Sequence, residues 1–288
     1  MLTDAQKAAR RIGGSDIATI MGLNPYRTAR DLYDEIMGVK PPFEGNEHTQ
    51  AGEVMESAIA DLYALRTGKT VRKSNLTHAH PQYPFLTAHI DRWTVGEKRI
   101  VEIKNVGRNG ARQWGEPGTD EAPVWYLMQA HHYMLVLDYP AADIVAYFGG
   151  GDLAIYPVER NADIDRAIIE AGAKFWACVE AQTPPEIDLN HPAAIDTLKR
   201  IYPGTDGDAV TGDDLLLAWS KVERDAAAMI TRYEKVQEGA KARILDAMGE
   251  AALITMPDGS KYTRKSITRA AYSVEASEYV QLTYKKAP

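Results

Sequence analysis

Two carboxylates and a lysine lie on two neighbouring extended segments, where together they could bind a divalent cation next to a phosphate group. The segments are residues 83–93 and 98–106. Their sequence pattern predicts a β-hairpin, and a turn centred on Gly96-Glu97 places Asp91 directly opposite Glu102. Opposed Cβ atoms are about 4.5–5.5 Å apart, so two like charges there are destabilising unless a cation with oxygen ligands lies between them.

Strand alternation adds a lysine to the same face. Glu102 and Lys104 are two residues apart, so both point to the side that bears Asp91. Carboxylate-bound Mg²⁺ lowers the pKa of a bound water and neutralises charge on a phosphate, and an ammonium group orients that water or stabilises the pentavalent transition state. The three side chains therefore predict metal-assisted hydrolysis of a phosphodiester.

Two alternatives stay open on the residues alone. A Glu-x-Lys pair on one strand face is usually a solvated ion pair, although Ile100, Val101 and Ile103 are typical of an inner strand. A turn centre shifted by one residue would place Asp91 on the opposite face of the hairpin.

The segments around this hairpin predict an α/β core in which helices flank a mixed sheet. A short helix is expected after Gly13-Gly14, with Ser15 or Asp16 as its N-cap. Longer helices are expected over about 28–37, 49–67, 123–138 and 162–181, and a second hairpin over 143–159. Pro184-Pro185 marks the expected boundary between a core of residues 1–188 and an extension of residues 189–288.

The extension has a helical pattern followed by a turn. Apolar residues recur every three or four positions from Leu215 to Met248, which predicts one long amphipathic helix or two. Trp219 and its apolar stripe indicate core or a subunit interface, and the charged face of Lys221–Arg243 is expected to dock a partner protein or a neighbouring subunit. Pro257-Asp258-Gly259 between strand-like runs predicts a further hairpin.

Composition excludes several classes of protein. No apolar run approaches the roughly 20 residues of a membrane helix, and the first residues lack the apolar stretch of a signal peptide. The single cysteine, Cys178, has no partner for a disulfide or a cysteine zinc site, which favours a reducing, cytoplasmic setting. A formal charge of −7 argues against coating nucleic acid through bulk positive potential, but not against holding DNA in one local groove.

Five segments, in this order, resemble the motifs of the YqaJ-type viral recombinase family, which is similar to the phage lambda-type exonuclease among the PD-(D/E)XK nucleases. The segments are GGSDIATIMGLNPYRTARDLYDEIMG, AGEVMESAIADLYALRTG, HPQYPFLTAHIDRW, IVEIKNV and YLMQAHHYMLV. The resemblance runs from about Arg10 to Pro185. It implies a PD-(D/E)XK restriction-endonuclease-like core, with a C-terminal helical and β-hairpin extension after it.

The resemblance also implies an activity. It is that of a Mg²⁺-dependent 5′-to-3′ exonuclease, which degrades one strand of linear double-stranded DNA from its ends beside a single-strand annealing protein in phage recombination. Two Mg²⁺ ions, with Mn²⁺ as a substitute, are expected. So are a ring-shaped homotrimer and a cytoplasmic location in a bacterial host of the phage or prophage.

Site residues carry over by the same resemblance. Asp91 and Glu102 would be the principal metal ligands, the Ile103 carbonyl a further ligand and Lys104 the catalytic lysine. By the resemblance, Glu56 would be an additional acidic residue of the site. Its position in the sequence alone indicates an ordinary exposed glutamate.

Further residues match positions outside the hairpin. Gln129 corresponds to a catalytic-site glutamine, with Tyr126 one turn before it, although Gln129 is equally suited to be a helix-packing amide. Arg11 and Ser15 fall where the family contacts a DNA phosphate, and Arg10 competes with Arg11 for that role. The N-cap and phosphate roles of Ser15 are compatible, because helix N-termini favour anions.

The chain departs from the family pattern at two positions. Arg92 follows Asp91 where glycine is usual, and it either alters the bend there or contacts a phosphate. His131 replaces the second glutamine of a Gln-x-Gln pair. The histidines do not predict zinc, since no two of them form the H-E-x-x-H motif and oxygen ligands already account for the site. They are His78, His80, His131 and His132.

Two other functions compete with the exonuclease. One is a metal-dependent endonuclease, which would also cut closed circular DNA. The other is a catalytically silent scaffold that binds DNA ends, although a pure binder has no need of two carboxylates that face each other.

Overall fold

The computed structural model describes residues 11–41, 45–107, 110–149 and 151–268. Contacts divide the chain into two units, Met1–Ile201 and Tyr202–Pro288. The candidate site lies in the first unit.

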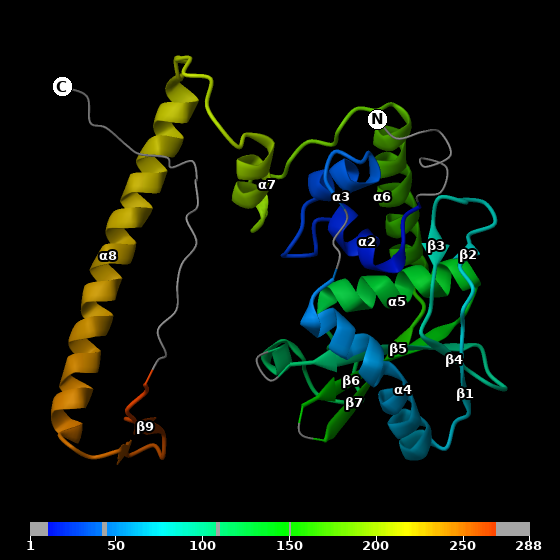
Figure 1. The fold of residues 1–288 in the computed structure, drawn as a ribbon, viewed down its shortest axis with the longest axis horizontal. Coiled ribbons are helices and arrows are strands. Elements are labelled where there is room, and N and C mark those ends of the chain that lie inside the picture. Colours follow the sequence, from blue (N-terminus) through cyan, green and yellow to red (C-terminus); the bar gives the residue numbers. More distant parts are fainter. Residues whose placement is uncertain (1–10, 42–44, 108–109, 150, 269–288) are drawn as a thin grey trace. The chain divides into compact units, whose positions relative to one another are not determined.

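Five strands form the central sheet of the first unit, in the order β1-β4-β5-β6-β7 (Figure 1). Strands β5 and β6 are parallel, and the other neighbours are antiparallel. A parallel pair needs a crossover connection, which here contains helix α5 (Val124–Leu137). The sheet is therefore mixed, as predicted. Its strands are β1 (Val71–Lys73), β4 (Arg92–Thr94), β5 (Arg99–Val106), β6 (Ala141–Phe148) and β7 (Asp152–Glu159).

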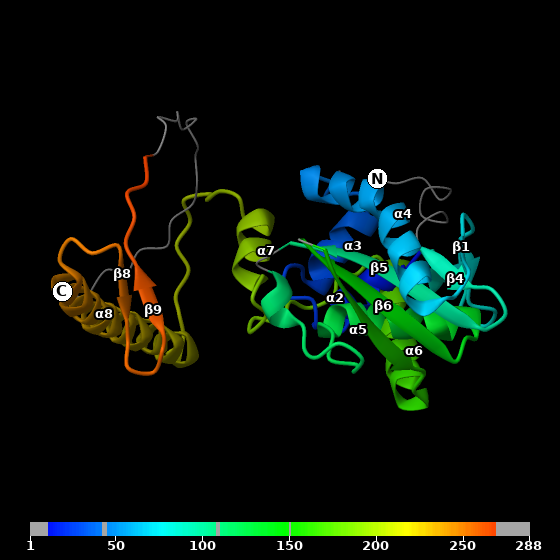
Figure 2. The ribbon, with the colours of Figure 1, turned by 90° about the horizontal axis from the view of Figure 1, so that it is seen from below.

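The two faces of β5 pack against different helices (Figures 1 and 2). Val101 and Ile103 pack with Tyr63 of α4 (Glu47–Thr67) in the smaller core. Ile100 belongs to the larger core on the other face. That core is closed by α2 (Gly14–Ile20), α3 (Ala29–Ile36), α5 and α6 (Ala162–Glu180). Since residues alternate along a strand, Glu102 and Lys104 share the α5 side with Ile100.

The first strand of the predicted hairpin is interrupted. The continuous strand expected over 83–93 is wrong: β3 (Thr87–Ala88) pairs with β2 (His78–Ala79), and β4 begins again at Arg92. Residues 89–91 between them belong to neither strand, so the chain changes sheets there.

Helix α2 begins differently from the expectation. Its N-cap is Gly13, so the assignment of Ser15 or Asp16 to that position is wrong. Asp16 occupies the third helical position, and its Oδ2 accepts the Gly13 N–H at 3.0 Å. A carboxylate there satisfies an amide that the helix leaves free.

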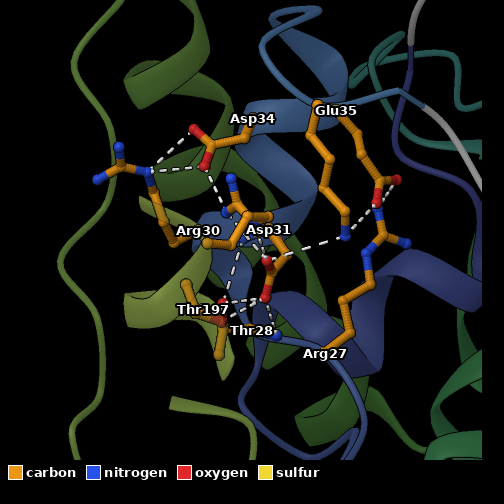
Figure 3. Close-up of polar contacts among 9 residues, drawn as sticks. Arg27, Thr28, Arg30, Asp31, Asp34, Glu35 and Thr197 are labelled. Atoms are coloured by element: carbon orange, nitrogen blue, oxygen red, sulfur yellow. Dashed lines mark hydrogen bonds and ion pairs between the residues drawn. The ribbon is translucent and has the colours of Figure 1, made fainter. Parts of the chain in front are cut away.

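Helix α7 (Ala194–Ile201) joins the end of the first unit to α3 (Figure 3). The Thr197 hydroxyl donates to Asp31 Oδ2 at 2.6 Å. Arg200 donates through Nε to Asp31 Oδ1 at 3.0 Å and through Nη2 to Asp34 Oδ2 at 2.6 Å. These contacts, which we call the α7 latch, assign residues 189–201 to the first unit. The division after Ile201 thus falls later than the boundary expected at 188/189.

The second unit contains one long helix and a small hairpin. Helix α8 (Asp214–Met248) is a single helix, and the Asp213 side chain caps it by accepting the Leu216 N–H. Strands β8 (Leu253–Thr255) and β9 (Lys261–Thr263) pair antiparallel around the predicted turn (Figure 2). No helix in the described part of the chain is both long and apolar enough to cross a membrane.

Candidate active site

The register of β4 and β5 brings the two predicted acidic ligands together. Arg92 pairs with Val101 and Trp93 with Ile100, which is the register given by a turn centred on Gly96-Glu97. Asp91 precedes β4 by one residue, and its Oδ2 accepts the Ile103 N–H at 2.8 Å. This hydrogen bond fixes the Asp91 carboxylate beside the middle of β5.

Lys104 lies among acceptors on the α5 side of β5. Its Nζ donates to Glu102 Oε1 at 2.7 Å and to Gln129 Oε1 at 3.0 Å. The same Nζ lies 4.7 Å from the centre of the Tyr126 ring, within the range of a cation–π interaction. The ammonium group is therefore held by a strand neighbour and by one helix.

Burial and like charge perturb the acids of this cluster. Burial first, and then the nearby Asp91 carboxylate, raise the pKa of Glu102 to about 7. Burial also raises the pKa of Asp91, against the opposing effect of Lys104. For Lys104, burial alone would lower the pKa, but the carboxylates of Glu102 and Asp91 outweigh it and raise the pKa. Such perturbed groups gather at functional sites more often than elsewhere.

One carboxylate oxygen of Glu102 is buried without a hydrogen-bond partner in the described part of the chain. The residue is 2% exposed, and its buried Oε2 has no hydrogen-bond partner within the described residues. A buried carboxylate oxygen without a partner is costly. A divalent cation shared with Asp91 would satisfy that oxygen and cancel the repulsion, so the residues present fit Mg²⁺. The protein would supply few side-chain ligands to this cation. Among the described residues, no group of three His, Cys, Asp or Glu side chains lies close enough together to hold a metal.

Glu56 is close to the cluster but already paired. The Arg92 guanidinium donates to Glu56 Oε1, to Ser57 Oγ and to the Asp91 carbonyl, and Lys73 Nζ lies 3.5 Å from Glu56 Oε1. Arg92, on the α4 side of β4, is thus ion-paired with Glu56. Of the two roles expected for Arg92, a phosphate contact does not fit this pairing.

Tyr133 belongs to the site, although it was not predicted from the sequence. Gln129 Nε2 donates to the Tyr133 hydroxyl at 3.1 Å, one helical turn along α5. The Tyr133 ring packs so closely on Gly14 that a Cβ at that position would overlap it. The hydrogen bonds therefore connect Tyr133, Gln129, Lys104 and Glu102 in series. The i to i+4 spacing of Gln129 and Tyr133 was the available signal.

The residues predicted to contact a DNA phosphate lie in two different places. Arg11 and Ser15 are exposed at the start of α2. Tyr126 lies at Lys104, with its ring stacked on Trp114 at 5.5 Å between centres. Arg10 lies outside the described residues.

The histidines of α5 serve the core. His131 and His132 are 5% and 0% exposed. His132 Nε2 lies 2.9 Å from the Thr87 carbonyl oxygen, an acceptor, so this nitrogen carries the proton. Burial lowers the pKa of His132 to about 4, which keeps the ring neutral.

The fold is that of the PD-(D/E)XK nucleases. An alkaline exonuclease from Laribacter hongkongensis is similar in structure, with a TM-score of 0.51 and 20% sequence identity over 70% of this chain and 98% of that one. The structure of that enzyme with dAMP gives a TM-score of 0.52 at the same identity. This likeness confirms the predicted fold class.

Two sequence comparisons agree with the family resemblance of the motifs. Residues 6–140 match the model of the YqaJ-like viral recombinase domain. Protein YqaJ of Bacillus subtilis (strain 168) is 33% identical over 199 residues, which are 68% of this chain and 61% of that protein. Residues 6–140 are thus similar to the YqaJ-like viral recombinase domain family, the resemblance that their motifs indicated. The chain spans about three-fifths of the length of the curated relative that it matches.

Proposed function

We propose that the protein is a Mg²⁺-dependent exonuclease that degrades one strand of linear double-stranded DNA. The observation that carries the proposal is the set of Asp91, just before β4, with Glu102 and Lys104 on β5, together with the buried Glu102 Oε2 that has no partner among the described residues. The fold shared with an alkaline exonuclease supports it.

Each residue has a distinct part in the proposal. Asp91, Glu102 and the Ile103 carbonyl would hold the metal, which supplies an activated water and charge neutralisation at the scissile phosphate. Lys104, held by Gln129, stabilises the negative charge that grows on the phosphate. Glu56 remains part of the site only if a bound cation or DNA draws it away from Arg92.

Four further parts of the proposal rest on the family resemblance. The enzyme would digest DNA from the 5′ end, use two metal ions with Mn²⁺ as a substitute, and form a homotrimeric ring around the DNA. A single-strand annealing protein would bind the exposed strand. A mass measurement that gives a monomer at working concentration would exclude the ring.

The first experiment compares linear 5′-phosphorylated duplex with closed circular duplex, in Mg²⁺ or EDTA. The variants are Lys104→Ala and, as a matched control, Lys98→Ala, whose side chain is exposed at the hairpin turn. We expect Mg²⁺-dependent loss of the linear DNA alone, abolished in Lys104→Ala and unchanged in Lys98→Ala.

Other results separate the competing functions. Cutting of both substrates would favour the endonuclease. Binding of linear DNA without cutting, by protein that a thermal melt shows to be folded, would favour the end-binding scaffold.

A further inference from the structure

Helix α8 has an apolar stripe that the described residues of its own unit leave uncovered. Within the described part of the second unit, Met248 is the one buried apolar side chain. Trp219, Met229 and Tyr233 are 60%, 57% and 66% exposed. A stripe this long marks an interaction surface more often than a solvated one.

The spacing along the stripe is that of a coiled coil. Its residues alternate steps of four and three over four heptads, which corresponds to a and d positions. The a positions alternate large and small: Trp219, Ala226, Tyr233 and Ala240. The d positions are Leu215, Val222, Met229 and Val236. The surface is hollowed at Ala226, beside Met229 and Tyr233.

We propose that α8 pairs in antiparallel orientation with α8 of a second copy of this chain. In antiparallel coiled coils an a residue of one helix packs in a layer with a d residue of the other. With the two-fold axis between Ala227 and Ala228, all eight positions find a partner, and each layer joins a larger side chain to a smaller one. The layers are Leu215–Ala240, Trp219–Val236, Val222–Tyr233 and Ala226–Met229, each formed twice.

The parallel alternative fits less well. It would set Trp219 against its own copy and Ala226 against its own copy, so overfilled layers alternate with underfilled ones. It would also bring two Arg243 side chains together at the next d position. In the antiparallel register Arg243 reaches beyond the partner helix, which begins at Asp214.

Charge on the flank of the stripe agrees with the antiparallel register. Asp225 and Arg232 occupy g positions, and in this register each faces the opposite charge of the other copy. Neither has an ion-pair partner among the described residues of its own chain. In a parallel pair the same two side chains would face Ile230 and Gln237, which carry no charge. Flanking charges of this kind set orientation in coiled coils.

The orientation is tested by disulfide formation in a Cys178→Ser background of the full chain. The variants are Leu215→Cys, Ala240→Cys and the two together. The positions are about 37 Å apart along one helix, at about 1.5 Å per residue, so they cannot join within a chain. We expect cross-linked dimers under mild oxidation from the double variant alone. Cross-linking of either single variant would show a parallel pair and overturn the proposal.

The association is tested by the mass of the full chain in solution. Val222→Asp, within the stripe, should halve the mass of the assembly, from a dimer to a monomer or, if the chains also form the proposed ring, from a hexamer to a trimer. Thr231→Asp, on the far side of the helix, should leave it unchanged. Asp225→Arg should weaken association several-fold, and Asp225→Arg with Arg232→Asp should restore it. A mass that Val222→Asp does not change would mean that the chain itself or another protein covers α8, and would overturn the proposal.

Discussion

The replacement Gln129→Leu tests whether the amide of Gln129 positions Lys104. Leucine has nearly the same volume, so the change removes one hydrogen bond to the ammonium group and leaves the Glu102 bond in place. A hydrogen bond to a charged group contributes about 1.5–3 kcal/mol. If that contribution is lost mainly in the transition state, kcat falls about 10- to 100-fold, at about 1.4 kcal/mol for each factor of ten.

Tyr133→Phe is a second variant of the same hydrogen-bond series and should have a smaller effect on kcat than Gln129→Leu. It keeps the Gln129 amide and removes only the hydroxyl that anchors it at 3.1 Å. A neutral hydrogen bond contributes about 1 kcal/mol, so kcat should fall about fivefold.

The assay for both is steady-state digestion of end-labelled linear duplex with saturating Mg²⁺, with kcat and KM determined separately. We expect KM within twofold of the unmodified protein, because neither residue contacts DNA in the proposal. A Gln129→Leu enzyme with full kcat, or one changed only in KM, would refute the positioning role. So would a larger loss in Tyr133→Phe than in Gln129→Leu.

Three further predictions concern the folded state and need no nuclease activity. Because the pKa of His132 falls to about 4 in the folded protein and is about 6.5 in an unfolded chain, the unfolded form binds the extra proton between these values, and the His132 contribution to the free energy of unfolding should drop by about 1.4 kcal/mol per pH unit from pH 6.5 towards 4. The raised pKa of Glu102 acts in the opposite direction, so this drop is measured as the difference between denaturant titrations of the unmodified protein and of His132→Gln. Gly14→Ala should destabilise by about 1–3 kcal/mol, because its Cβ overlaps the Tyr133 ring, whereas Gly52→Ala, with open space around it, should not; equal melting temperatures would contradict the close packing. Asp31→Ala should cost about 2–4 kcal/mol, because it removes one of the two acceptors of the α7 latch and the carboxylate that caps α3. The exposed Asp196→Ala should cost less than about 0.5 kcal/mol, and a thermal melt that does not separate the two variants would show the Asp31 contacts to be dispensable.

The pairing in the hairpin was predictable because it depends on residues that are close together in the sequence. Alternation along β5 and a glycine at the turn fix which residues are opposed, and the observed pairing of Arg92 with Val101 has the expected register. The break before β4 was not predictable, since nothing in the pattern of residues 83–93 shows that Thr87 and Arg92 belong to different sheets.

Contacts between distant elements were beyond the sequence patterns. Alternation places Arg92 on the α4 side of the sheet, but the rotation of α4 that presents Glu56 to Arg92 depends on packing of the whole helix. The latch residue Thr197 gave no signal, because α7 is short and its partner Asp31 lies 166 residues away.

The α7 latch has a consequence for the order in which the chain is made. A ribosome releases the buried carboxylates of Asp31 and Asp34 long before it adds Arg200, which follows Asp31 by 169 residues. Until then the cationic partners of these acids are Arg30, for Asp34, and Lys40, for Asp31, and Asp31 also lacks the hydroxyl group of Thr197. The nascent first unit therefore lacks these contacts at one of its earliest helices until nearly its last residues emerge, and a chain stopped at residue 188 would hold every predicted site residue without the α7 latch.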